Sequence, residues 1–371
     1  MTGFRRLLFF ALFLTFDLIM FGAFVRITDA GLGCPDWPGC YGKATPLGAM
    51  DAIRAEAAVR PDGPVTVFKA WVEMLHRYVA AGLGLIVIAL AVMATRVARR
   101  RARPEPPAGP REPPPAGTVR VEGVAPGVAL AWFTLFWIVL QGIFGAWTVT
   151  LKLKPLVVTA HLLGGMILFA LLLAQAVRVA GHPPVGLGAA RLRGWIAAGL
   201  ALLFVQIALG GWVSTNYATL ACRDFPTCQD VWWPPMDFAA GFELWRRLGV
   251  TGDGDALPFQ ALTAIHVTHR LGAVVVFAVL ATIAIRARRV AGLGRIADGL
   301  FAVLLLQWAT GLTNVFMGWP LAAAVLHTGG AAALLGLLLV LHFRARAAAQ
   351  PPAGVVRDGP RRGGAAAAAG V

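Results

Sequence analysis

Residues 34–40 read Cys-Pro-Asp-Trp-Pro-Gly-Cys and residues 222–228 read Cys-Arg-Asp-Phe-Pro-Thr-Cys, so both follow the pattern C-x-D-aromatic-P-x-C. Each copy is followed by a His-Arg pair in an apolar stretch, at His76-Arg77 and at His269-Arg270. Farther along each half a second histidine lies in an apolar stretch, and each follows a glutamine by 20 positions: His161 after Gln141, and His327 after Gln307. Because an internal repeat sets the architecture of a chain, the sequence predicts two homologous halves.

The composition is that of a polytopic membrane protein. Of 371 residues, 58% are hydrophobic and only 14% are charged, and the mean hydropathy is +0.71. Crossing ~30 Å of hydrocarbon takes about 20 apolar residues, and every backbone polar group must be paired inside the span, which favours helices. The sequence therefore predicts an all-α membrane protein with eight transmembrane helices, at 7–25, 70–95, 125–149, 155–178, 194–213, 259–285, 297–317 and 321–343.

The distribution of charge predicts the orientation of these helices. Lys and Arg far outnumber Asp and Glu in segments 1–6, 96–124, 179–193, 286–296 and 344–371, whereas the opposite loops are balanced. By the positive-inside rule both termini are cytoplasmic, and the cysteine loops lie on the periplasmic side of a bacterial cytoplasmic membrane. The net charge of +15 then reflects topology and attraction to the lipid bilayer. Nucleic-acid binding is disfavoured, because no folded basic face is predicted.

Two segments are predicted to carry no chemistry. The proline-rich stretch 101–118 is expected to be a stiff linker within an N-terminal half of residues 1–179. The Ala, Gly, Pro and Arg-rich segment 347–371, which follows a C-terminal half at 194–346, is expected to be a disordered cytoplasmic tail.

All four cysteines fall in the loops predicted to lie outside the cell. In an oxidising compartment cysteines this close usually form a disulfide. Identical spacing in the two halves favours pairing within each loop, Cys34–Cys40 and Cys222–Cys228, while the cross-loop connectivities stay open. A structural staple and a redox-active pair are both consistent with this pattern. Zinc is disfavoured, because the loops contain no histidine.

Four of the seven histidines form the strongest candidate site. They lie roughly six to ten residues inside the periplasmic ends of alternate spans, which at ~1.5 Å per residue is about 9–15 Å deep. A polar side chain at that depth is costly and marks a functional site by default. Nothing else there would complete a zinc or copper site, so two bis-histidine haem sites are favoured. The four candidate haem ligands are His76, His161, His269 and His327.

Other residues support this interpretation less strongly. His182 and His342 are most simply interfacial. Glycines near the ligand candidates could admit a planar guest, although ordinary helix packing explains them equally well: Gly82, Gly84, Gly164, Gly165, Gly329 and Gly330. Arg77 and Arg270 are intramembrane cations that need an anionic partner, which haem propionates would supply.

The two halves differ three residues before the His-Arg pair, where the first has Glu73 and the second has His266. Positions i and i+3 share a helix face, so Glu73 is expected to point toward the same cavity as His76. A carboxylate beside a haem edge can move protons or stabilise a cation, which makes the first half the reactive site and the second an electron-transferring site. His266 stays open as an alternative ligand to His269. Asp17 is expected to be hydrogen-bonded inside the bundle, with a proton path as the alternative.

These residues also carry a family resemblance. The run 26–40, Arg-Ile-Thr-Asp-Ala-Gly-Leu-Gly-Cys-Pro-Asp-Trp-Pro-Gly-Cys, together with residues 73–77, Glu-Met-Leu-His-Arg, resembles the haem A synthase family. The segments around His161, His269 and His327 resemble it as well, and the likeness covers nearly all of residues 5–345. The resemblance implies eight helices in two pseudo-symmetric four-helix bundles. It also implies oxidation of the C8 methyl group of haem O to a formyl group for haem-copper oxidases, with water as the oxygen source.

The resemblance also assigns roles residue by residue. It implies that His269 and His327 bind a haem b cofactor, that His76 and His161 flank the haem O substrate, and that Glu73 stabilises a substrate cation. Cys34 and Cys40 match a periplasmic disulfide of the family. Electrons would pass to a quinone or a redox protein; contact with the haem O-forming enzyme and homo-oligomerisation stay open. One alternative is a di-haem cytochrome, which does not explain the difference between Glu73 and His266 or the paired cysteines. The other is a haem transporter, which is disfavoured because the spans look continuous.

Overall fold

The computed structural model describes residues 2–61, 63–102, 127–181 and 185–348, and all regular secondary structure in them is helical. Eight of the described helices are long and apolar enough to cross a membrane. They are α1 (Thr2–Ile27), α3 (Val67–Arg101), α4 (Val128–Thr150), α5 (Pro155–Ala180), α6 (Arg193–Thr215), α8 (Phe259–Arg288), α9 (Gly294–Phe316) and α10 (Leu321–Ala347). Each overlaps one predicted span, so the prediction of eight transmembrane helices is confirmed. Most of the predicted linker, His182 and the tail beyond Ala348 lie outside the described residues.

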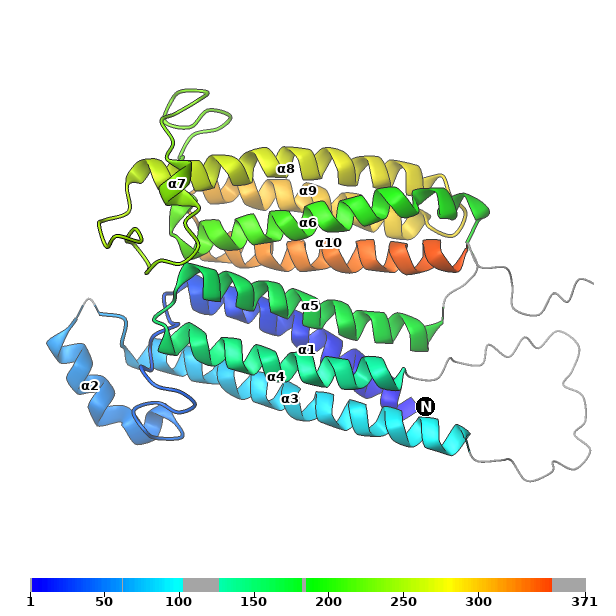
Figure 1. The fold of residues 1–371 in the computed structure, drawn as a ribbon, viewed down its shortest axis with the longest axis horizontal. Coiled ribbons are helices and arrows are strands. Elements are labelled where there is room, and N and C mark those ends of the chain that lie inside the picture. Colours follow the sequence, from blue (N-terminus) through cyan, green and yellow to red (C-terminus); the bar gives the residue numbers. More distant parts are fainter. Residues whose placement is uncertain (1, 62, 103–126, 182–184, 349–371) are drawn as a thin grey trace, which may run out of the picture.

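Five short helices lie at the ends of these spans. At the end that carries the cysteine loops are η1 (Pro46–Ala49), α2 (Met50–Val59), η3 (Ala218–Leu220) and α7 (Phe238–Gly241). At the opposite end η2 (Leu187–Leu192) leads into α6. The N-terminus lies at this opposite end too (Figure 1).

The long helices form two four-helix bundles side by side (Figure 1). In the first, α1 packs on α3, α3 on α4, α4 on α5 and α5 on α1; in the second, α6, α8, α9 and α10 close the same ring in the same order. The bundles meet where α1 packs on α10 and where α5 packs on α6. In the second ring α6 takes the place of α1, and α10 takes the place of α5. The contact of α1 with α10 and the contact of α6 with α5 are therefore equivalent, so the interface contains the same helix pairing twice. This is the arrangement expected from the sequence repeat.

The apolar cores fill the ends of the bundles that lie away from the cysteine loops. The first core contains Phe4, Leu8, Leu83, Leu90 and Leu172. The second contains Ile196, Leu280, Ile283, Leu300 and Leu338 and continues into the first bundle through Met166 and Phe169. These aliphatic layers bury the apolar surface that stabilises each bundle. The ends of the bundles nearer the cysteine loops can therefore hold polar side chains.

A polar cluster joins the bundles at the cysteine-loop end. Arg26, in the last turn of α1, donates to the carbonyl oxygen of Ser214 (2.7 Å) and pairs with Asp29 (3.0 Å). Tyr217 donates to the same carboxylate (2.6 Å), and its ring lies 4.0 Å beneath the Arg26 guanidinium. Burial, followed by the hydrogen bond to Asp29, raises the pKa of Tyr217, so the phenol stays protonated as a donor. This cluster fixes the two bundles to each other.

Candidate functional site

The four predicted ligands come from helices at opposite corners of each bundle. His76 lies on α3 and His161 on α5, which stand diagonally in the first ring of helices. His269 on α8 and His327 on α10 stand in the same way in the second ring. Each bundle therefore presents two histidines from diagonal helices, an arrangement that suits two ligands of one planar group.

Each of these histidine rings lies against a glycine of a neighbouring helix. A Cβ atom built on the glycine would lie 3.1 Å from the ring at Gly210 and 3.3 Å at Gly22, closer than side chains normally pack, and 3.4 Å at the other two glycines, in direct contact. The pairs are Gly22 with His76, Gly145 with His161, Gly210 with His269 and Gly311 with His327. We call Gly22, Gly145, Gly210 and Gly311 the ring-contact glycines. They leave room for imidazole rings at positions that an alanine would partly fill.

The glycines singled out from the sequence have other environments. Nothing lies within 4 Å of a Cβ at Gly82 or Gly84. Side chains at Gly164 and Gly330 would instead overlap Gln141 and Gln307, the two glutamines of the repeat. The small size of Gly164 and Gly330 therefore serves the packing of their helices against these glutamines. The repeat itself contained the missed signal, because Gly22 and Gly210 are 188 residues apart, as Cys34 and Cys222 are.

The second-bundle histidines have side-chain partners at Nδ1. Thr310 Oγ1 lies 2.9 Å from His327 Nδ1 and also donates its proton to the carbonyl of Leu306 at 2.9 Å. With its proton on the Leu306 carbonyl, the hydroxyl accepts from His327 Nδ1–H, and this tautomer leaves the lone pair of Nε2 free to bind iron. Gln206 Nε2 lies 3.0 Å from His269 Nδ1 and donates to the carbonyl of the same residue (2.9 Å).

In the first bundle, His161 Nδ1 is buried and has no hydrogen-bond partner among the described residues. A buried imidazole with an unpaired nitrogen calls for a further ligand or partner. The donor set is therefore compatible with haem in both bundles, and among the described residues Thr310 is the side chain that can orient one of the four histidines, His327, for binding through Nε2.

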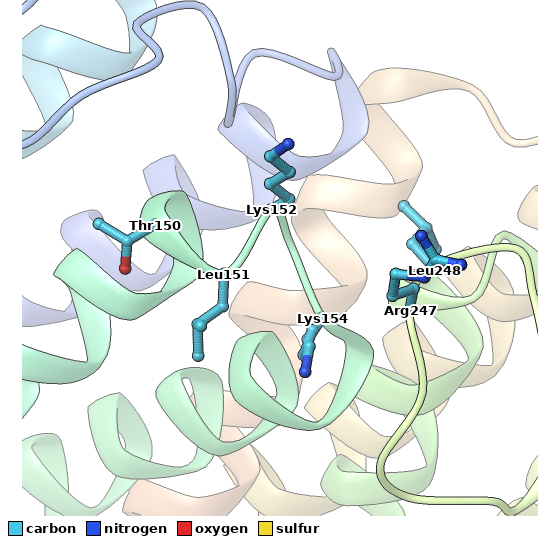
Figure 2. Close-up of a pocket in the computed structure, with 6 residues that line it drawn as sticks. All are labelled: Thr150, Leu151, Lys152, Lys154, Arg247 and Leu248. Atoms are coloured by element: carbon cyan, nitrogen blue, oxygen red, sulfur yellow. The ribbon is translucent and has the colours of Figure 1, made fainter. Parts of the chain in front are cut away.

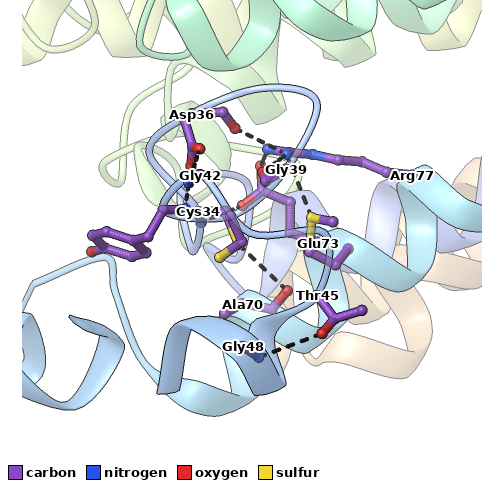
Figure 3. The surroundings of a disulfide bond; sticks show 12 residues. Cys34, Asp36, Gly39, Gly42, Thr45, Gly48, Ala70, Glu73 and Arg77 are labelled. Carbon is purple, nitrogen blue, oxygen red and sulfur yellow. Dashed lines mark hydrogen bonds and ion pairs between the residues drawn. A yellow bond between two sulfur atoms is a disulfide. The ribbon is translucent and has the colours of Figure 1, made fainter. Parts of the chain in front are cut away.

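Glu73 ties the first cysteine loop to α3 (Figure 3). Helix α3 begins after Thr66, whose hydroxyl accepts from the Lys69 N–H (3.1 Å). In the second turn of the helix, Glu73 Oε1 pairs with Arg77 (2.6 Å) and Oε2 accepts from the Cys34 N–H (2.9 Å). The Glu73 side chain is only 5% exposed and that of Arg77 is 13% exposed, so the carboxylate is buried and the guanidinium is partly buried. The carboxylate thus lies one turn from His76 and is held by both the helix and the disulfide loop.

Arg77 completes this connection. Its guanidinium donates to the carbonyls of Gly39 (2.7 Å) and Asp36 (2.9 Å). In the second half Arg270 donates to the carbonyls of Thr227 (2.9 Å) and Cys222 (3.0 Å). The partners that the structure shows for these arginines include the cysteine-loop carbonyls, which the sequence did not reveal; the expected contact with haem propionates stays a prediction.

Both cysteine pairs close within their own loop, Cys34 to Cys40 and Cys222 to Cys228, which confirms the favoured connectivity. The two loops also share one internal hydrogen-bond pattern. Asp36 accepts from the N–H groups of Tyr41 and Gly42, and Asp224 accepts from those of Gln229 and Asp230. Although desolvation acts to raise the pKa of Asp224, these bonds and that from Thr227 lower it.

The structure also bears on two residues whose roles the sequence analysis left less certain, His266 and Asp17. His266 is buried and its Nδ1 lies 2.9 Å from the carbonyl of Ala218, so it occupies the place of Glu73 without bonding its cysteine loop. The expected hydrogen bond of Asp17 is absent: among the described residues its side chain has no hydrogen bond or ion pair. The expectation was wrong because the carboxylate is partly exposed on α1.

A family model described as cytochrome oxidase assembly protein (COX15-CtaA) matches residues 5–339. The chain belongs to this family. It is 35% identical over 331 residues to a protein named haem A synthase from Shewanella oneidensis, covering 89% of this chain and 92% of the relative. Proteins of the same name from Caulobacter vibrioides and Mesorhizobium japonicum are 26% and 28% identical. Those matches cover 91% and 94% of this chain and 95% and 91% of the relatives. This family member is thus related to haem A synthases over nearly its whole length.

Proposed function

We propose that the chain is a haem A synthase, which oxidises the C8 methyl group of haem O to a formyl group. The observation that carries the proposal is the placement of two histidines on diagonal helices of each bundle, each ring lying against a glycine of a neighbouring helix. Membership of the family and the name of the relatives support it. The protein would lie in the bacterial cytoplasmic membrane with both termini cytoplasmic and both disulfide loops periplasmic.

The two bundles have different roles in this proposal. Residues 1–179 form the substrate half, in which His76 and His161 flank haem O. Residues 194–346 form the cofactor half, in which His269 and His327 hold haem b. The Nδ1 partners support this division, because ligands of a permanent cofactor are typically oriented by a further hydrogen bond, as His327 is by Thr310. A substrate that must leave is better served by His161, whose Nδ1 is unpaired.

The reaction must balance as R–CH₃ + H₂O → R–CHO + 4 H⁺ + 4 e⁻. The electrons must leave the site, and haem b, when bound, supplies a one-electron relay toward a quinone or a redox protein. Glu73 places a negative charge one turn from His76, where it would stabilise positive charge on the oxidised substrate. Arg77 and the Cys34 N–H hold that carboxylate in place. Arg270 keeps an unpaired Nε–H, which can donate to a haem propionate.

Haem extraction and mass analysis of the purified protein test this proposal. Wild type from cells that make haem O should contain haem b and haem A. His269→Ala should lose haem b, whereas Glu73→Ala should keep haem b and accumulate haem O or a partly oxidised haem. His342→Ala, near the far end of α10, is the matched control and should behave as wild type. Two haems b per chain in wild type and in Glu73→Ala alike would identify a di-haem cytochrome instead.

A further inference from the structure

A basic pocket lies at the cysteine-loop end of the first bundle, away from the four histidines. Its volume is about 360 Å³, within the range of small-ligand sites. The turn between α4 and α5 contributes one wall and the segment before α8 contributes the other (Figure 2). The pocket is lined by Thr150, Leu151, Lys152, Lys154, Arg247 and Leu248.

The lining is strongly positive. Three of its six residues are cations, Lys152, Lys154 and Arg247, and none is acidic. Among the described residues none of the three forms an ion pair. The ammonium group of Lys154 lies 3.9 Å above the ring of Trp245, which fixes it without neutralising it. Such a cluster favours an anion as its occupant.

The fold does not require these lysines, as the sequence repeat shows. The turn between α9 and α10 has the same backbone form. Leu153 N–H bonds the carbonyl of Thr148 and Trp319 N–H bonds that of Asn314. Lys152 and its counterpart Gly318 both have positive φ, 52° and 66°. Glycine adopts this backbone conformation without strain, whereas a lysine at position 152 adopts it with a cost in conformational energy.

The position of the pocket indicates the kind of anion. Helix α4 ends at Thr150 and α5 begins at Pro155, so the pocket lies where a span leaves the hydrocarbon. Phosphate groups of phospholipids lie at this level, and basic side chains there attract anionic lipids. Leu151 and Leu248 add apolar surface beside the cations, which suits a headgroup that is joined to acyl chains.

We propose that this pocket binds the phosphate group of an anionic phospholipid, contacted by Lys152 and Arg247. The contact would join the α4–α5 turn of the first bundle to the segment before α8 of the second. A bound lipid would therefore stabilise the arrangement of the bundles, independently of any haem chemistry.

The thermal unfolding of the full chain in neutral detergent tests the proposal. Phosphatidylglycerol should raise Tm in a saturable manner, phosphatidylcholine should not, and inorganic phosphate should act only at far higher concentration. Lys152→Gly, which copies the counterpart turn, and Arg247→Gln should each weaken the phosphatidylglycerol effect roughly tenfold, as expected for one lost contact to a charged group. Arg54→Gln, an exposed cation on α2, should leave it unchanged.

Three results would contradict the proposal. Equal shifts with phosphatidylglycerol and phosphatidylcholine would show an unspecific effect of lipid. An undiminished phosphatidylglycerol effect in both pocket variants would place the lipid elsewhere. Inorganic phosphate that acts at the same concentration as phosphatidylglycerol would overturn the assignment to lipid in favour of a free anion. Native mass spectrometry gives an independent readout, since retained phosphatidylglycerol should fall in the two variants even if one of them lowers Tm by itself.

Discussion

Replacing Gly210 by alanine should reduce haem b binding while leaving the fold intact. The new Cβ would lie 3.1 Å from Cε1 of His269, whereas carbon atoms pack best at about 3.5–4.0 Å. The ring would have to move by roughly 0.4–0.9 Å, and overpacking of this kind costs about 1–3 kcal/mol. In the haem-free protein the ring can turn away, so the cost falls mainly on the ligated state. At ~1.4 kcal/mol per tenfold, haem b affinity should fall about 5- to 150-fold.

The stability of the haem-free protein should change little. Alanine is favoured over glycine in a helix by about 1 kcal/mol, and this gain offsets what remains of the cost of the contact with the His269 ring. Haem b per chain, measured as the pyridine haemochrome after purification, is the primary readout, and haem-free Tm is the second. Gly194→Ala is the control on the same helix, since nothing lies within 4 Å of its Cβ. Gly22→Ala, at the equivalent position of the first bundle, should retain haem b and slow haem A formation. Full haem b in Gly210→Ala, or equal loss in Gly22→Ala, would refute the reasoning.

Three further substitutions have defined outcomes. Thr310→Val removes the acceptor of His327 Nδ1–H and should weaken haem b binding about 10–100-fold; a normal haem b titration would show that Thr310 does not orient the ligand. Glu73→Gln removes the buried charge but keeps an amide of the same size, so haem A should disappear from extracts while haem b stays, and unchanged haem A would exclude a role for the charge. Tyr217→Phe removes the 2.6 Å hydrogen bond to Asp29 and should destabilise the protein by about 0.5–1.5 kcal/mol without altering haem content; equal urea midpoints for variant and wild type would contradict this.

The ring-contact glycines show why part of the site escaped sequence reasoning. Many glycines lie in the spans, and composition cannot distinguish one that faces a ring from one that faces lipid. Gly82 follows the candidate ligand His76 in the chain yet has nothing within 4 Å of its Cβ, while Gly145 lies on another helix than His161 and is in contact with its ring. The deciding contacts cross between helices. Only the repeat spacing, applied to every glycine, could have found these positions from the sequence.

The arginines give a second example. A cation inside an apolar span demands an anion or several acceptors, and the sequence correctly indicated that need at Arg77 and Arg270. It did not reveal that each guanidinium donates to the carbonyls of its own cysteine loop, because those loops precede the arginines by more than 35 residues. Glu73 was predicted on the face of His76 and lies one turn from it, but its bond to the Cys34 N–H depends on how the loop folds back.

The sequence by itself determined the number of spans and the duplication into halves, favoured the disulfide partners that the structure shows, and pointed to the four histidines. These properties depend on hydrophobic length and on spacing along the chain, which any window of sequence contains. Only the tertiary structure decided which glycine lies against each ring, which carbonyls Arg77 and Arg270 contact, and that lysines and an arginine from different bundles line one pocket. Those relations depend on the closing of two rings of helices. Residues far apart in the chain become neighbours there, and packing between helices, unlike the formation of a helix, is set by the partner surface.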